Sequence, residues 1–254
     1  MPDHESALAL TVLGTATPFP APDDPCSGYL LSHRDTRIWV DAGSGTLGEL
    51  QRHTTLEDLD AIWISHLHVD HCADLATLVY GLLFSNISRD PIPLYGPPGT
   101  MERLRHFLTN KETPAPVEKA YEFHELHDGH RTRIGEVTLT TRSVEHDMPA
   151  FGLHAEADGM SLVYSGDTVP CDAFTELASE CDLLLCVADG YVNTDLLYSP
   201  VQAGETARRV RAGRLVLTHV GRFITKEEAV ADAAKAFSGP VEAARTGRTY
   251  LPGR

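Results

Sequence analysis

The chain has 254 residues, of which 42% are hydrophobic and 22% charged. This composition excludes an intrinsically disordered chain and is sufficient for a packed core. No apolar run reaches the roughly 18 residues that a membrane span needs. The first five residues contain two acids and no Lys or Arg, whereas a secretory signal begins with basic residues. We therefore expect a cytoplasmic protein that does not enter a membrane.

The charge balance limits the substrates to consider. Asp and Glu number 36 against 21 Lys and Arg, which leaves a net charge of −15. Binding to long nucleic acids relies on Lys and Arg that neutralise phosphates, so we expect a small-molecule substrate instead. A late cluster of arginines fits a solvated helix face: Arg208, Arg209, Arg211 and Arg214. The five cysteines include no C-x-x-C pair, which argues against disulfides and a zinc ribbon.

Apolar patterning predicts the elements in chain order. Short apolar runs bounded by turn residues predict strands at Leu8–Leu13, Tyr29–Leu31, Ile38–Asp41 and Ala61–Ser65. Helical spacing then predicts helices over about Ala73–Phe84 and Met101–Leu108. The second half predicts strands at Val137–Val144, Ser161–Ser165, Leu183–Val187 and Leu215–Thr218, with helices over roughly Val201–Arg211 and Glu227–Phe237. We expect an α/β (α+β) protein in which two packed sheets are covered by helices, as a single domain over residues 1–254.

A dense group of metal-binding residue types follows the strand at Ala61–Ser65. His66, His68, Asp70 and His71 lie within six residues. In an extended backbone, positions two apart point the same way, so the first two histidines can bind one ion. The aspartate and the third histidine lie where the chain turns into the next helix and can face a second ion. Imidazole and carboxylate ligands suit zinc, with manganese or iron as alternatives.

This H-x-H-x-D-H pattern resembles the metallo-β-lactamase superfamily of metallohydrolases. Further ligands of that superfamily have counterparts in the expected order: His146 at a strand end, Asp167 in a Gly-Asp-Thr turn, and His219 after the strand at Leu215–Thr218. The opening Val12-Leu13-Gly14-Thr15 and the turn Val40-Asp41-Ala42-Gly43 resemble the small ribonuclease Z-like branch. The resemblance covers nearly the whole chain and implies a four-layer αβ/βα sandwich of two mixed β-sheets.

The resemblance also implies roles for these side chains. The first zinc ion is expected on His66, His68 and His146, and the second on Asp70, His71 and His219, with Asp167 between them. Two such ions share a hydroxide that serves as the nucleophile, and Asp70 is counted among the catalytic residues for this reason. Asp41 either orients the metal loop or caps nearby amides. Relatives commonly form homodimers, and this chain could do the same.

The chain departs from ribonuclease Z at two positions near the expected site. A glutamate and a histidine that guide protons in those enzymes are replaced by Val187 and Leu197. Asp189, Tyr191 or Tyr198 could deliver the proton from a shifted position, and ordinary loop residues are the alternative for each. Only 20 residues separate His146 from Asp167. This interval leaves no room for the arm with which ribonuclease Z grips transfer RNA.

Two other groups favour a structural interpretation. His124, His127 and His130 surround an Asp-Gly pair typical of a turn between strands, which would scatter the three side chains in a polar surface loop. Cys72 adjoins the metal motif but is expected to pack against its neighbours.

The expected function is a dinuclear zinc hydrolase. Hydrolysis of a small or cyclic phosphodiester is favoured by the overall resemblance. Acyl hydrolysis of a thioester, lactone or amide is the alternative, because a good leaving group has less need of the missing glutamate and histidine. A non-catalytic metal-binding sensor is the third hypothesis.

Overall fold

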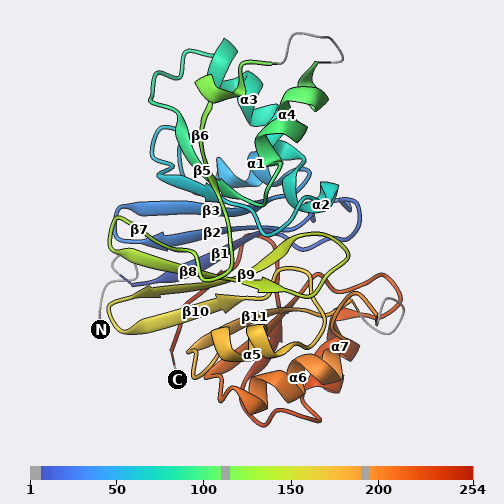
Figure 1. Ribbon diagram of the computed structural model, residues 1–254. Helices are drawn as coiled ribbons and strands as arrows, with labels where there is room; N and C mark the ends of the chain where they lie inside the picture. The colour runs from blue at the N-terminus through green and yellow to red at the C-terminus, as the bar shows by residue number, and fades with distance from the viewer. Residues whose placement is uncertain (1–6, 110–114, 190–194, 254) are drawn as a thin grey trace.

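Two sheets stack face to face in the computed structural model, which describes residues 7–109, 115–189 and 195–253 (Figure 1). The first sheet has the order β14-β1-β2-β3-β4-β5-β6. Its strands are β1 (Ala9–Gly14), β2 (Gly28–His33), β3 (Thr36–Ala42), β4 (Ala61–Trp63), β5 (Ile92–Gly96), β6 (Tyr121–Glu125) and β14 (Thr249–Tyr250). Strands β3 to β6 run parallel, whereas β14, β1, β2 and β3 pair antiparallel. The sheet is therefore mixed.

The second sheet has the order β13-β12-β11-β10-β9-β8-β7. Its strands are β7 (Arg131–Ile134), β8 (Val137–Val144), β9 (Ala150–Ala157), β10 (Met160–Tyr164), β11 (Leu183–Val187), β12 (Arg214–Thr218) and β13 (Val241–Ala243). Strands β10 to β13 are parallel and β7 to β10 antiparallel, so this sheet is mixed as well.

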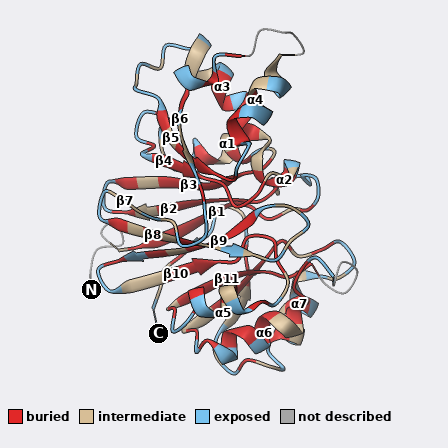
Figure 2. Ribbon diagram, viewed as in Figure 1, coloured by how far each residue is buried: buried red, intermediate tan, exposed pale blue. Residues whose placement is uncertain are grey.

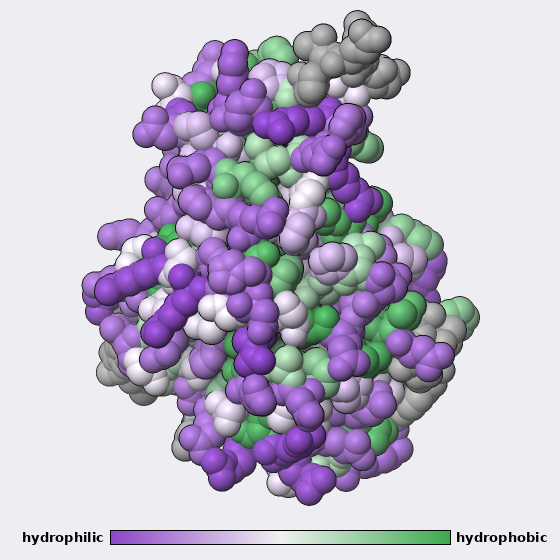
Figure 3. All heavy atoms as spheres, in the orientation of Figure 1, coloured by the Kyte–Doolittle hydropathy of each residue, from purple (hydrophilic) through white to green (hydrophobic). Residues whose placement is uncertain are grey.

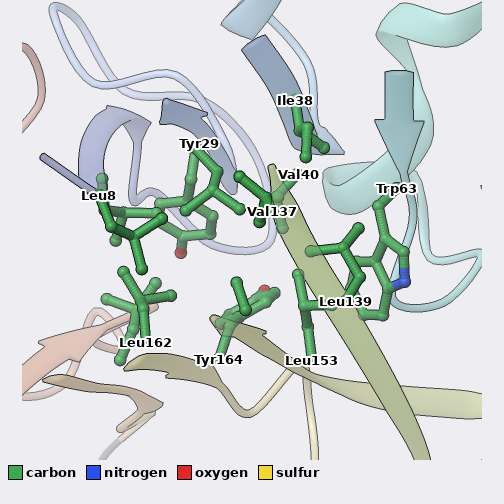
Figure 4. Close-up of a cluster of buried hydrophobic side chains, with 14 of the residues drawn as sticks. Leu8, Tyr29, Ile38, Val40, Trp63, Val137, Leu139, Leu153, Leu162 and Tyr164 are labelled. Atoms are coloured by element: carbon green, nitrogen blue, oxygen red, sulfur yellow. The ribbon is translucent and has the colours of Figure 1, made fainter. Parts of the chain in front are cut away.

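The main core lies between the two sheets (Figure 4). Strand β8 shows how the sequence builds it: its first, third and fifth residues are buried while the second, fourth and sixth are partly exposed. Period-two alternation of this kind places one face of a strand in the core. Val137 and Leu139 thus meet Ile38, Val40 and Trp63 of the first sheet in one cluster.

Helices cover the outer face of each sheet, which gives four layers (Figures 1 and 2). The first sheet is covered by α1 (Thr46–Leu50), α2 (Val69–Cys72), α3 (Asp74–Phe84), α4 (Thr100–Leu108) and the short η1 (Val117–Lys119). The second is covered by α5 (Asp172–Leu177), α6 (Pro200–Arg209) and α7 (Lys226–Ala233). Complete capping boxes start α6 at Ser199 and α7 at Thr225, so local sequence fixes both starts.

The predicted architecture of two mixed sheets flanked by helices is confirmed. No helix within the described ranges combines the length and the apolar character needed to cross a membrane. The five cysteines are free, and all except the half-buried Cys72 are buried, as expected for reduced thiols.

Candidate metal centre

The seven predicted ligands converge at one end of the sandwich. His66 and His68 lie in the loop after β4, and α2 carries Asp70 and His71. The other three follow strands of the second sheet: His146 follows β8, Asp167 follows β10 and His219 follows β12. Because the carboxyl ends of β8, β10 and β12 meet at the same edge, residues far apart in sequence share one site.

The first group consists of His66, His68, His146 and Asp167, and it could hold a metal ion. The Nε2 atom of His66 lies 3.1 Å from Nδ1 of His68. The same Nδ1 atom lies 3.2 Å from Nε2 of His146. Zinc–nitrogen bonds of about 2.0–2.1 Å in a tetrahedron place ligand atoms roughly 3.3–3.4 Å apart. The spacing of the three ring nitrogens therefore fits one zinc-sized ion.

The second group consists of Asp70, His71 and His219. Oδ2 of Asp70 lies 3.3 Å from Nε2 of His219 and 3.8 Å from Nε2 of His71. Asp167 faces both groups, because its Oδ1 is 3.5 Å from Nε2 of His71 and its Oδ2 is 3.8 Å from Nε2 of His66. One carboxylate thus connects the two sets of potential ligands.

Buried ligand atoms that lack hydrogen bonds favour a cation at this place. His71, Asp167 and His219 are buried, and Nε2 of His71 and Oδ1 of Asp167 have no hydrogen-bond partner among the described residues. A buried polar atom without a hydrogen bond costs free energy. Imidazole nitrogens and carboxylate oxygens are preferred ligands of zinc and similar ions, so the donor set fits such a metal.

The pKa shifts agree with this interpretation. Burial and the neighbouring His71 hold the pKa of His66 well below its usual value, so this imidazole stays neutral, as a metal ligand must be. Burial lowers the pKa of His71, but Asp167 and Asp41 outweigh burial and raise that pKa well above its usual value. The carboxylates therefore stabilise positive charge next to His71, whether it comes from a proton or from a metal ion.

Asp41 contacts the second group at the ring atom of His71 that does not face the potential metal position. Its Oδ2 accepts hydrogen bonds of 2.8 Å from the hydroxyls of Ser65 and Tyr164. The same oxygen lies 2.8 Å from Nδ1 of His71, and Oδ1 accepts from the backbone N–H of Ser65. A carboxylate on Nδ1 fixes the tautomer that leaves Nε2 available for a ligand bond. Asp41 thus both orients a histidine and satisfies a backbone amide, which combines the two alternatives left open by the sequence.

Backbone contacts at the site require glycine. A Cβ atom added to Gly43 would lie 2.1 Å from the carbonyl oxygen of Asp70, which is too close for any side chain. Gly166, directly before Asp167, has a φ of +59° and would meet the carbonyl of Phe151 at 2.6 Å. Glycine permits both the positive φ and the close approach. These two positions hold the backbone of Asp70 and Asp167 in place.

Comparison with known proteins agrees with this geometry. Residues 36–220 match the family model of the β-lactamase superfamily domain. The chain belongs to this superfamily. A Mycobacterium tuberculosis protein, Rv1339, is 34% identical over 254 residues, covering 96% of this chain and 92% of its own. Ribonuclease Z of Mycobacterium bovis (strain BCG / Pasteur 1173P2) is 32% identical over 276 residues, covering 92% of this chain and 95% of its own.

Solved structures of the superfamily resemble the whole chain. The metallo-β-lactamase fold protein YhfI from Bacillus subtilis has a TM-score of 0.85 at 27% identity, covering 96% of this chain and 99% of its own. The short form of human tRNase Z has a TM-score of 0.77 at 24% identity, covering 97% and 100%, which shows a shared fold. This superfamily member is accordingly a metallo-hydrolase with a His/Asp cluster that could hold metal.

Two of the three residues considered for proton delivery, Asp189 and Tyr198, lie in the described part of the chain, and both are buried. Asp189 lies two residues after the end of β11 and is buried, and its Oδ1 lies against Gly221, two residues after His219. Tyr198 is buried in the apolar cluster under α6, where its hydroxyl accepts a hydrogen bond of 3.3 Å from Thr206. Burial raises the pKa of Tyr198, so its proton is held tightly. Tyr191 lies outside the described residues.

The two positions that depart from ribonuclease Z have apolar surroundings. Val187 and Leu197 are both buried and belong to the cluster on the outer face of the second sheet. They therefore contribute to packing, and neither side chain can carry a proton.

One charged side chain at the site was missed by the sequence analysis. Oδ1 of Asp147 lies 3.3 Å from Nε2 of His146 and 3.6 Å from Nε2 of His68, and its side chain is partly exposed. Its position directly after His146 was the available signal. Asp147 adds negative charge at the open side of the first group.

The other histidine cluster differs from its prediction. The turn at Asp128-Gly129 is present, with a φ of +74° at Gly129. However, His124 belongs to β6 and stacks on Tyr95, with ring centroids 4.6 Å apart. The rings of His127 and His130 lie 4.9 Å apart. His124 therefore lies in a strand and not in the predicted loop. None of the three histidines belongs to a group in the described ranges that could hold a metal ion, as expected for a structural role.

Proposed function

We propose that the protein is a dinuclear zinc-dependent hydrolase that acts on a small substrate. His66, His68 and His146 would hold one ion and Asp70, His71 and His219 the other, with Asp167 between them. The observation that carries this proposal is the position of the Asp167 carboxylate, whose two oxygens face the two groups. Bound in such a pair, zinc ions lower the pKa of water and stabilise developing negative charge.

The surrounding residues of the chain have separate tasks. Asp41 holds Nδ1 of His71, so that Nε2 keeps its direction through the reaction. We assign proton delivery to the leaving group to Asp189, because it follows β11, the strand beside β12, and lies against the loop after His219. Donation by Tyr198 stays a prediction. Its hydroxyl oxygen accepts the hydrogen bond from Thr206 and keeps its own proton, but burial raises its pKa and opposes donation.

Two reaction classes fit the proposed centre. Hydrolysis of a small or cyclic phosphodiester ranks first, because relatives over the whole chain include proteins named ribonuclease Z. Acyl hydrolysis of a thioester, lactone or amide is the alternative. It is favoured by the burial of Val187 and Leu197, since a substrate with a good leaving group depends less on a dedicated acid.

Charge supports a small substrate. Three of the four late arginines face acids of the same chain. Arg209 pairs with Asp172, and Arg211 pairs with Glu180. Arg214 likewise lies 3.5 Å from Glu242. Paired arginines contribute little to phosphate binding, and the net charge of −15 repels polyanions. We also propose a cytoplasmic location and a homodimer, and light scattering of the purified protein tests the second.

Side-by-side assays test the function. Zinc-loaded protein is incubated with bis(p-nitrophenyl) phosphate, an acyl-thioester and a lactone, and zinc content is measured in parallel. Turnover of the first supports the phosphodiesterase, and turnover of either other substrate supports the acyl hydrolase. Full zinc occupancy without turnover of any of them would favour a metal-binding sensor. Protein free of transition metal and insensitive to chelators would overturn the proposal.

A further inference from the structure

An apolar pocket lies next to the metal loop, between α2, α3 and α4. It has a volume of about 100 Å³, and its walls include Leu67, Val69, Leu75, Ala76, Leu104 and Phe107. Two of these side chains are unusually exposed for their type, Val69 at 62% and Phe107 at 76%. Figure 3 shows hydrophobic side chains at the surface where Figure 1 places α2. Concave apolar surfaces of this kind are typical of small-molecule sites.

The pocket has one positive charge, Arg103. This exposed guanidinium forms no ion pair with any residue in the described ranges, although the protein is strongly acidic. Arg105, on the same helix, instead lies 3.5 Å from Glu118. An unpaired arginine beside an apolar cavity can bind a carboxylate or a phosphate through charge-assisted hydrogen bonds.

The pocket and the candidate metal centre share a segment of chain. Leu67 and Val69 alternate with His68 and Asp70, so the loop that carries potential metal ligands also forms a wall of the pocket. Val69 is exposed between two of those ligands. A molecule that occupies the pocket would have to pass over the exposed Val69 to reach the metal centre.

We propose that this pocket binds the non-reacting end of the substrate, a short aliphatic or aromatic group that carries a carboxylate or phosphate for Arg103. The inference rests on the proposed hydrolase function. An apolar cavity of roughly 150 Å³ accepts benzene, so 100 Å³ suits a chain of about four carbons. A small ligand is favoured because a concave surface occurs together with an arginine that has no ion-pair partner among the described residues.

Calorimetric titration of the zinc-loaded protein with acetate, butyrate, hexanoate and octanoate tests the pocket without a turnover assay. Each added methylene should strengthen binding about threefold to fourfold until the cavity is full. Affinity that does not change with chain length would overturn the proposal.

Carboxylates can also bind to metal ions, so two variants distinguish binding in the pocket from binding at the metal centre. Ala76→Leu fills the cavity and should weaken hexanoate binding at least about tenfold, because roughly two methylenes or more lose their place. Arg103→Gln should weaken it about fivefold. Arg105→Gln, with the same charge change on the same helix, should bind as the wild type does. Unchanged affinity in Ala76→Leu, with unchanged zinc content, would mean that hexanoate binds elsewhere.

An inhibition experiment tests whether the pocket is part of the substrate site. Hexanoate should inhibit turnover of the active reporter substrate competitively, and non-competitive inhibition would overturn this assignment. If no reporter is hydrolysed while binding still follows chain length and Arg103, the hydrolase proposal fails and the pocket assignment stands. If light scattering shows a dimer that Phe107→Asp dissociates, and only the monomer binds hexanoate, a second copy covers the pocket and the proposal is wrong.

Discussion

The two ends of the sandwich use histidines and carboxylates in different ways. At the metal end, His71 and Asp167 are buried and Asp41 fixes the ring of His71. At the opposite end, Arg34 in the β2–β3 turn pairs with Glu136 and Asp158 of the second sheet, and the side chains of these carboxylates are 49% and 57% exposed. The metal end has buried potential ligands and a carboxylate that orients one of them. At the other end, the ion pairs of Arg34 are exposed to solvent and connect the two sheets. Variants at the two ends test this contrast.

The largest effect is expected for His68→Ala, which removes a ring that lies near both His66 and His146. Zinc content and turnover should fall together, by more than the roughly 10–100-fold that loss of an outer partner costs. Elemental analysis and the reporter assay measure both. His106→Ala, an exposed histidine on α4, is the matched control. Wild-type zinc content in His68→Ala would break the ligand assignment.

Asp189→Asn keeps the size of the side chain and removes its ability to exchange a proton. If Asp189 delivers the proton, turnover should fall about a hundredfold with zinc retained, within the range for general acid catalysis. Steady-state kinetics at saturating substrate measure this loss. A rate equal to that of the wild type would mean that Asp189 is an ordinary loop residue with no part in proton delivery.

Asp41→Asn should weaken zinc binding by roughly 10–100-fold, because an amide cannot provide both oxygens that serve Ser65 and His71. Competition with a chelator of known affinity gives the zinc dissociation constants. Tyr164→Phe removes only one donor to Asp41 and should have a smaller effect. Equal zinc affinity in Asp41→Asn and the wild type would contradict the supporting role.

The smallest effect is expected at the end of the sandwich opposite the candidate metal centre. Arg34→Gln should lower the free energy of unfolding by about 0.5–1 kcal/mol, because exposed ion pairs contribute little. Zinc content and turnover should stay unchanged. Urea denaturation monitored by circular dichroism gives the stability. A loss of turnover in this variant would show that the two ends are coupled.

The sequence predicts the strands that lead to the potential ligands well, because runs such as β12 (Arg214–Thr218) are apolar and buried. It does not predict β13 and β14, which have only three and two residues. Strand β5 also escapes prediction, since Pro93 and the prolines around it resemble a loop. Assignment of residues 1–254 to a single domain stays a prediction.

The candidate site is predictable only in part. The spacing of His66, His68 and Asp70 is local and can be read directly from the sequence. In contrast, the bond from Tyr164 to Asp41 joins residues 123 positions apart and follows from sheet packing alone. Residues that support or surround a ligand are visible only after the chain has folded.

The origin of the seven potential ligands also concerns how the protein resists unfolding. His66, His68, Asp70 and His71 follow β4 of one sheet, whereas His146, Asp167 and His219 follow strands of the other. An ion bound at their meeting point would act as a cross-link between the two sheets. Each tenfold excess of free zinc over its dissociation constant then adds about 1.4 kcal/mol to stability. A melting temperature that rises with the zinc concentration would show that bound metal stabilises the contact between the two sheets.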